Sequence, residues 1–369
     1  MMRLDLALHQ ARGKPVCIGA GFVALDIVES GVQPFAAAGG SCGNVMAILS
    51  WLGWDAKPVA RIGADWAGEL VATDMARSGA DVTSLCVEDR VKTPIVIERF
   101  VEHASGQRSH RFSLTCPGCG AWLPRYRALT ISQIDEFVAQ APRPRAFYFD
   151  RVSPATVKLA RWAKDQGAIV VFEPSSIGDE RLFQKSVEVC HILKFSHDRL
   201  RHVHDLAEAA GPRMIIETKG EQGLRVRWRS RWSEFPAFGV TNLRDAAGSG
   251  DWCSAGLIHK LAHGGAKTLE ELRKADLDNA LRFGQALAAV NCNFDGARGA
   301  MLALSQKQFG RMLMRLKENG KKGTIDYSDS VAGGLKIPID LCGICSSAPH
   351  TGNQSAGVKA QTSARSGSR

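Results

Sequence analysis

The chain has 369 residues, of which 45% are hydrophobic, 23% charged and 7% aromatic. This composition is typical of a folded globular protein and excludes coiled coils, collagen-like repeats and wholesale disorder. The net charge of +10 fits nucleic acid, an acidic membrane face or a phosphorylated small molecule, so charge alone does not choose a partner.

Neither export nor membrane insertion is expected. No apolar run reaches the roughly 20 residues that span a bilayer, and residues 1–14 lack an uninterrupted apolar stretch before a cleavage site. Most of the ten cysteines are isolated in apolar segments, as in a reducing compartment. Basic residues are dispersed, and the alternating Arg225, Arg227, Arg229 and Arg231 fit a solvated strand face. We therefore expect a cytoplasmic protein without a membrane or nucleic-acid partner.

Short apolar runs alternate with segments of helical period along most of the chain. Strands are predicted at residues 16–19, 58–62, 146–149, 168–172, 189–193 and 214–218, and helices at 44–52, 68–77, 131–140, 154–166 and 198–209. This alternation predicts an α/β fold with a mostly parallel sheet that is covered on both faces. Ligands then bind at the carboxyl ends of its strands.

Residues 93–114 interrupt this alternation. Two β-type runs joined by Ala104, Ser105 and Gly106 predict a β-hairpin that projects as a flap, and an edge hairpin of the main sheet is the alternative. After about residue 320 the helical patterns stop, and from residue 346 small and polar residues dominate. We expect one folded domain over 15–318, including this hairpin, and a tail over 319–369 that is disordered from about residue 346.

A glycine-rich turn runs from Asp245 through Gly248, Ser249 and Gly250 to Asp251 and opens a helical pattern. Glycines let the backbone approach an anion, and the free N–H groups at a helix start stabilise developing negative charge. A carboxylate beside this anion hole can accept a proton from an attacking hydroxyl, as phosphoryl transfer requires. A plain turn capped by Asp245 is the alternative.

This turn resembles the Asp-Thr-x-Gly-Ala-Gly-Asp segment of the ribokinase-like (PfkB-type) carbohydrate kinases, with Ala246 in place of Thr. A second match is the Gly39-Gly40-x-x-x-Asn44 series, which is followed by Leu-Gly at 52–53 and Ile-Gly-x-Asp-x-x-Gly at 62–68. The resemblance spans about residues 16–317. It implies a ribokinase-like three-layer sandwich with a mostly parallel central sheet and a small β lid, and ATP-dependent phosphorylation of a hydroxyl of a sugar or related polyol.

The resemblance also implies roles for individual residues. It makes Asp251 the catalytic base and the backbone of Gly248, Ser249 and Gly250 the anion hole. It assigns Asp26, Gly40 and Asn44 to the sugar or polyol substrate, and Thr218, Gly220, Gly223, Asp245 and Asn291 to ATP. Its cofactors are ATP and Mg²⁺, and a monovalent cation beside the turn is compatible with it.

Two segments depart from the family pattern. Glu173-Pro174-Ser175 replaces Asp-x-Asn, and residues 196–199 replace the Asn-x-x-Glu motif that organises magnesium. Glu173 or Asp198 could hold a metal-bound water instead, or Arg199 could contact a phosphate directly. A kinase-fold regulator without turnover is therefore an alternative function, and a nucleoside kinase is the alternative within the enzymes.

Two Cys-x-x-Cys pairs, Cys116 with Cys119 and Cys342 with Cys345, could present four thiolates to a structural zinc ion. Most of the chain separates the pairs, which favours two independent pairs of free thiols over a joint zinc site. The exposed edge of the hairpin sheet further predicts a homodimer through the lid.

Overall fold

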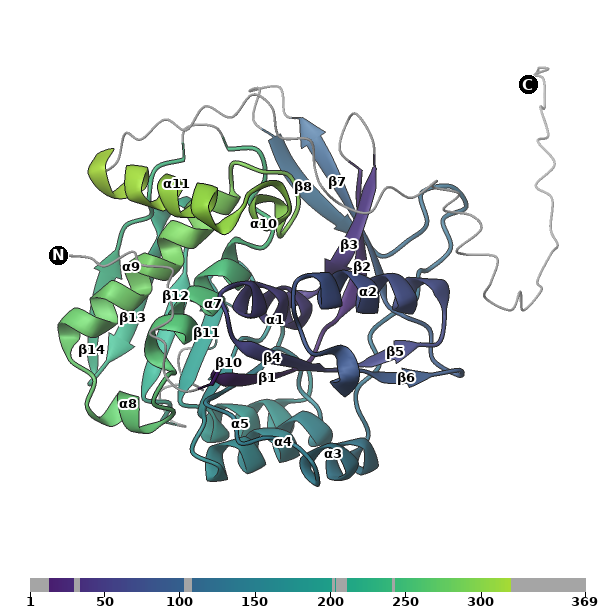
Figure 1. Ribbon diagram of the computed structural model, residues 1–369, viewed down its shortest axis with the longest axis horizontal. Coiled ribbons are helices and arrows are strands. Elements are labelled where there is room, and N and C mark those ends of the chain that lie inside the picture. Colours follow the sequence, from purple (N-terminus) through teal and green to yellow (C-terminus); the bar gives the residue numbers. More distant parts are fainter. Residues whose placement is uncertain are drawn as a thin grey trace, which may run out of the picture.

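The computed structural model describes residues 13–29, 34–102, 108–200, 203, 211–240 and 243–319. Its largest element is an eight-stranded sheet in the order β14-β13-β12-β11-β10-β9-β1-β4 (Figure 1). These strands are β1 (Val16–Ala20), β4 (Asp55–Val59), β9 (Ala146–Phe149), β10 (Ile169–Phe172), β11 (Ile192–Ser196), β12 (Met214–Thr218), β13 (Leu224–Trp228) and β14 (Arg231–Phe235). The six strands from β4 to β12 pair in parallel, and β13 and β14 pair antiparallel, which confirms the predicted sheet.

Helices cover both faces of this sheet because its central strands are apolar on both sides. Every residue of β9 and β10 is buried. One face packs against α1 (Ser41–Trp51), α7 (Ser249–Leu261), α9 (Lys274–Asn291) and α11 (Gln306–Asn319), with the short α8 (Lys267–Glu270) and α10 (Gly299–Ala303) nearby. The other face packs against α3 (Ile131–Val138), α4 (Pro154–Asp165) and α5 (Glu180–Val189) (Figure 1). The two hydrophobic cores therefore lie on opposite sides of the sheet.

A separate four-stranded sheet, called the lid sheet below, has the order β3-β2-β7-β8. It contains β2 (Ala24–Glu29), β3 (Phe35–Gly39), β7 (Ile95–Glu102) and β8 (Arg108–Ser113), and α2 (Trp66–Arg77) packs beside it. A two-stranded sheet pairs β5 (Arg61–Gly63) with β6 (Cys86–Glu88), and η1 (Val82–Ser84) and η2 (Gly220–Gln222) are single 3₁₀ turns. The predicted hairpin is thus β7–β8, and it belongs to the lid sheet rather than to the edge of the main sheet.

Three predicted elements need correction. The run at 58–62 is divided between β4 and β5, which belong to different sheets. The run at 189–193 is also divided, because α5 continues to Val189 and β11 starts at Ile192. The four alternating arginines do not share one strand: Arg229 lies in the turn between β13 and β14 with φ 50°, a left-handed conformation that reverses the chain.

Some predictions fall on residues outside the described ranges. These are most of the helix expected at 198–209, the hairpin turn at 104–106, the tail from residue 320 onward and the second cysteine pair. Within the described ranges, no helix combines the length and the apolar character needed to cross a membrane.

Candidate active site

The glycine-rich turn begins helix α7 at the carboxyl ends of β10 and β11. Gly248 is the N-cap of α7 and has φ 69°, and a Cβ at this position would overlap the carbonyl oxygen of Ala297. The first N–H groups of a helix have no partner within the helix. The N–H of Ser249 donates to the carbonyl oxygen of Ala246 at 3.2 Å, and the N–H groups of Gly250 and Asp251 leave a donor-rich, electropositive end. Glycine at position 248 is therefore required to form the turn that exposes these donors.

Asp251 lies in the first turn of α7 and is almost completely buried, with 9% of its surface exposed. Its Oδ2 accepts a hydrogen bond of 2.8 Å from Nδ2 of Asn44 on α1. Burial and the nearby charge of Glu173 raise the pKa of Asp251 well above its usual range, while Asn44 and Lys194 oppose this shift. The structure thus brings two predicted site residues together across 207 positions of sequence.

A buried ion pair lies directly behind this turn. Lys194 of β11 is 1% exposed, and its Nζ donates to Oε1 of Glu173 and to the carbonyl oxygen of Gly250, the latter at 3.1 Å. The hydroxyls of Tyr148 and Ser254 donate to Oε2 of Glu173. The ion pair therefore joins the main sheet to the glycine-rich turn and places two opposite charges near Asp251.

Asp26 approaches the same region from strand β2 of the lid sheet. Its carboxylate accepts a hydrogen bond from the backbone N–H of Gly40 and lies so close to Gly39 that a Cβ there would overlap it. Burial raises the pKa of Asp26 to about 7, although Arg298 and the Gly40 bond oppose the shift. Gly40 has φ 76° and precedes α1, which carries Asn44. Asp26, Gly40 and Asn44 are thus neighbours.

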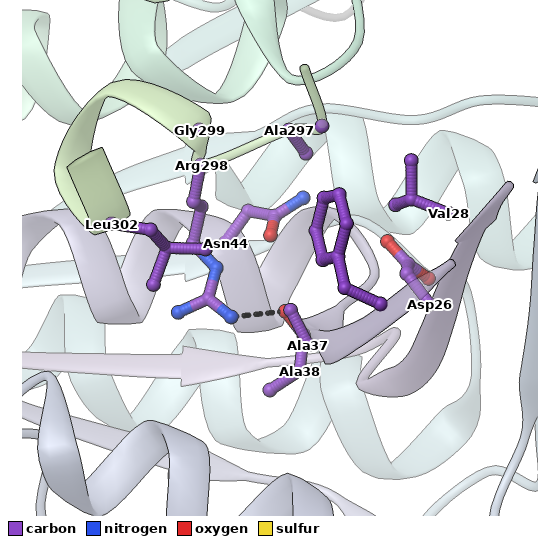
Figure 2. A pocket seen from close by; sticks show the side chains of 11 residues that line it. Asp26, Val28, Ala37, Ala38, Asn44, Ala297, Arg298, Gly299 and Leu302 are labelled. Atoms are coloured by element: carbon purple, nitrogen blue, oxygen red, sulfur yellow. Dashed lines mark hydrogen bonds between the residues drawn. The ribbon is translucent and has the colours of Figure 1, made fainter. Parts of the chain in front are cut away.

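A small cavity of about 10 Å³, enough for one water molecule, lies between the lid sheet and residues 296–302. Figure 2 shows Asp26, Asn44 and Arg298 around it. Arg298 donates to the carbonyl oxygen of Ala38 and to Asp74 of α2. Within the described ranges, the buried Oδ1 of Asn44 and Nη1 of Arg298 have no hydrogen-bond partner. These atoms therefore leave polar capacity beside Asp26 for a bound molecule.

Asp245 and Asn291 support the glycine-rich turn from below. The carboxylate of Asp245 accepts bonds of 2.8 Å from the N–H groups of Ala247 and Gly296. Asn291 is fully buried on α9, and its Nδ2 lies 3.2–3.4 Å from the carbonyl oxygens of Ala247, Gly296 and Ala297. These contacts give both residues structural roles in shaping the turn.

Thr218, Gly220 and Gly223 connect β12 to β13. The chain reverses there through η2, with a 2.7 Å bond from Lys219 N–H to the carbonyl oxygen of Gly223. The carbonyl oxygen of Thr218 accepts from His197 N–H at 2.9 Å, which keeps this turn beside the end of β11. Gly220 has φ 56° and open space where a Cβ would point. The turn therefore lies at the same end of the sheet as Asp251 and leaves room for a ligand.

Glu173 and Asp198 are not arranged as direct ligands of magnesium, and their expected role through a metal-bound water stays a prediction. The oxygens of Glu173 are already bonded to Lys194, Tyr148 and Ser254. Asp198 and Arg199 are exposed, and no cluster of three or more potential metal ligands occurs within the described ranges. Mg²⁺ binds protein carboxylates and substrate phosphates, and a carboxylate that is already neutralised by an ammonium group binds it poorly.

The first cysteine pair forms a turn at the end of the lid sheet. Cys116 is buried and Cys119 is exposed, and Gly120 N–H donates to the carbonyl oxygen of Cys116 at 2.9 Å. Both cysteines are free thiols. Cys342 and Cys345 lie outside the described residues, so the joint zinc site stays an untested prediction.

Sequence reasoning missed several groups at this site. Lys194 lies inside an apolar strand, and Asp150 and Arg151 directly follow another apolar strand. In the sequence alone, these residues look like ordinary members of a strand or a loop. A charged residue within or directly after a buried parallel strand was the available signal, because parallel strands direct their carboxyl ends toward the ligand side of the sheet. Arg298, which is buried with Asp74, carried no comparable signal.

Comparison with known proteins agrees with this geometry. The pfkB family carbohydrate kinase model matches residues 26–303. Fructokinase of Escherichia coli is 27% identical over 301 residues, covering 73% of this chain and 89% of that protein. The ATP-dependent ribose-1-phosphate kinase of Halopiger xanaduensis is 25% identical over 271 residues, covering 72% of this chain and 83% of that protein.

The fold has a solved counterpart in aminoimidazole riboside kinase from Salmonella enterica, complexed with aminoimidazole riboside and an ATP analog. That structure gives a TM-score of 0.61 at 20% identity, over 81% of this chain and 99% of the other. The ribokinase-like architecture expected from the sequence is thereby confirmed. The chain belongs to the pfkB family of carbohydrate kinases, and it is a phosphotransferase with a hydroxyl group as acceptor.

Proposed function

We propose that this protein transfers the γ-phosphoryl group of ATP to a hydroxyl of a sugar or related polyol, with Asp251 as the base. The observation that carries the proposal is the joint position of Asp251 and the glycine-rich start of α7, with Asn44 held 2.8 Å from the Asp251 carboxylate. A raised pKa suits this role, because a base works best when its pKa is close to the working pH.

The backbone of Gly248, Ser249 and Gly250 forms the anion hole that stabilises the charge developing on the transferred phosphoryl group. Asp26 and Asn44 bind acceptor hydroxyls, since a carboxylate accepts and an amide both donates and accepts. Thr218, Gly220 and Gly223 border the ATP. Magnesium supplies charge neutralisation when it accompanies the phosphates of ATP. In this chain the backbone of the glycine-rich turn provides fixed dipoles, and Lys194 behind it holds the turn through the carbonyl oxygen of Gly250.

Two other functions remain as alternatives. A nucleoside acceptor is favoured by the similarity to aminoimidazole riboside kinase, and a kinase-fold regulator by the altered segment at 196–199. An ATP-consumption screen across sugars, sugar phosphates and nucleosides separates the three functions. Binding of ATP without turnover of any acceptor would favour the regulator.

The Asp251→Asn variant tests the base directly. Loss of a general base should lower kcat by about 10²- to 10⁴-fold, while ATP affinity and melting temperature stay close to wild type. Asp165→Asn, at the exposed end of α4, is the matched control and should keep full activity. Near-normal phosphorylation by Asp251→Asn would refute the assignment.

A further inference from the structure

Arg151, which follows strand β9, has one edge of its guanidinium group engaged and the other edge open. Its Nη1 donates to the backbone oxygen of Asp150 at 3.1 Å, to Oδ2 of Asp150 at 3.2 Å and to Oγ of Ser175 at 3.1 Å. Within the described ranges, no hydrogen bond is formed by its Nε or Nη2, and a quarter of the side chain is exposed. The side chain is therefore fixed in place while two donors stay available.

The guanidinium group packs against Phe22, which contacts the turn that carries the proposed acceptor residues. The guanidinium carbon is 4.6 Å from the ring centre of Phe22. The carbonyl oxygen of Phe22 accepts from Gly43 N–H, directly before Asn44, and the Phe22 N–H donates to Asp150 at 2.8 Å. The charge of Asp150 contributes to the raised pKa of Asp251. Arg151 is thus linked through Phe22 and Asp150 to the turn before Asn44, on the acceptor side.

Tyr126 adds a third donor at this place. Its ring centre is 5.9 Å from the Arg151 guanidinium carbon and packs edge-on against Phe22 at 6.2 Å. The Oη of Tyr126 is buried and has no hydrogen-bond partner among the described residues. A buried hydroxyl without a partner is costly, so a water molecule or a ligand group is needed to complete its hydrogen bonding.

The chemistry of these donors selects the ligand. A guanidinium edge offers two parallel N–H donors that match a carboxylate or a phosphate, and a phenol can donate to either. Asp150 offsets the charge of Arg151, and the exposed Arg125 and Arg127 precede and follow Tyr126 along the chain. A neutral hydroxyl would leave most of this donor capacity unused.

We propose that Arg151 and Tyr126 bind an anionic group carried by the acceptor, so that this kinase prefers a sugar or polyol bearing a carboxylate or a phosphate over its neutral counterpart. This inference rests on the proposed function. The same donors would also suit the γ-phosphate of ATP, and the experiment distinguishes these two sources.

The test measures kcat and KM at saturating ATP for two matched acceptor pairs, ribose with ribose 5-phosphate and glucose with gluconate. We expect wild type to give a higher kcat/KM for the anionic member of a pair. Arg151→Met should lower that value by about 10- to 100-fold, which corresponds to a charge-assisted hydrogen bond, and lower the value for the neutral member by a clearly smaller factor. Arg151→Lys should recover part of the loss, and Tyr126→Phe should lose several-fold. Arg145→Met, at the opposite end of β9, is the control.

Two outcomes would overturn the inference. One is a wild-type preference for the neutral members. The other is an equal fall in kcat on both members in Arg151→Met, which would assign the arginine to the γ-phosphate. If wild type phosphorylates no acceptor, the proposed function fails. The inference is then tested by calorimetry, which measures acceptor binding in the presence of a non-hydrolysable ATP analog. Binding of ribose 5-phosphate or gluconate that is lost in Arg151→Met would uphold it, and equal binding or no binding by both proteins would contradict it.

Discussion

Two opposite charges act on the carboxyl group of Asp251. Glu173 raises its pKa and Lys194 lowers it, in addition to the dominant effect of burial, and Asp150 contributes a further rise. A general base works only when ionised, so we expect kcat/KM to increase with pH through the pKa of Asp251. Removing the negative charge in Glu173→Gln should lower this pKa and move the acid limb of the pH–rate profile to lower pH.

The opposite change provides the internal comparison. Lys194→Met should move the acid limb to higher pH, and Glu136→Gln, exposed on α3, should not move it. Lys194→Met alone also leaves Glu173 without its ammonium partner, so the double variant Lys194→Met/Glu173→Gln should unfold at a higher urea concentration than Lys194→Met. An acid limb that stays at the same pH in all these variants would show that Asp251 does not control it.

At the scale of single elements, the glycine-rich turn depends on one residue conformation. Gly248 combines a left-handed φ of 69° with backbone contact against Ala297, whereas Gly178 has φ 62° and open space around it. Gly178→Ala should cost only the left-handed strain of about 1–2 kcal/mol. Gly248→Ala should cost more in urea unfolding and also lower kcat, because the turn must move away from Ala297. Equal stability losses in both variants, with full activity, would contradict this account.

The lid strand β7 is joined to the same turn by a carboxyl group. Glu98 is 1% exposed and hydrogen-bonded to Asp245. Burial raises its pKa from 4.5 to about 10, and the charges of Asp245 and Asp26 contribute to this rise. The folded state therefore keeps a proton that the unfolded chain loses, so this residue makes stability fall as the pH rises from about 4.5 to about 10.

Glu98→Gln tests this prediction, because the amide keeps a donor toward Asp245 and does not ionise. Melting temperatures measured between pH 5 and pH 9 should decline less steeply in Glu98→Gln than in wild type, whereas Glu136→Gln should follow wild type. The pKa values of Asp26 and Asp150 are raised to about 7 and about 6. Both residues therefore also make the melting temperature fall as the pH rises, and this contribution persists in every variant. Parallel curves for wild type and Glu98→Gln would refute the proposed link.

The elements that could be predicted best from the sequence are those whose conformation is determined by local composition. The apolar runs of β1, β9 and β12 could be read directly, because a parallel strand covered on both faces needs apolar residues throughout. Strand β3 was missed because its sequence, Phe-Ala-Ala-Ala-Gly, has no β-branched residue, and its strand conformation comes from pairing with β2. Its existence is a tertiary effect.

At the scale of the whole molecule, some residues of the candidate site could be predicted from local sequence and others could not. The glycine turn and Asp251 could be located from local sequence because their spacing is fixed along the chain. The pair of Glu173 and Lys194 could not, because it depends on the register of β10 against β11, where Phe172 faces Leu193 and the next residues become neighbours. The hydrogen bond between Asn44 and Asp251 likewise depends on the contact between α1 and α7.

The lid sheet also bears on how the molecule associates, and we propose that two copies pair through it. Strand β8 is an edge of that sheet, and large apolar side chains are exposed on or just after it: Phe112 (49%), Leu114 (41%) and Trp122 (68%). An edge strand with exposed apolar residues favours pairing with a second strand, and a second copy supplies one with identical chemistry.

Light scattering after size-exclusion chromatography should give twice the mass of one chain. Trp122→Lys/Leu114→Lys should give the mass of one chain and leave the melting temperature of the core nearly unchanged. Met314→Lys, at a residue of α11 that is 51% exposed, is the control and should stay dimeric. A monomeric wild type at micromolar concentration would contradict the proposal and leave the lid to function within one chain.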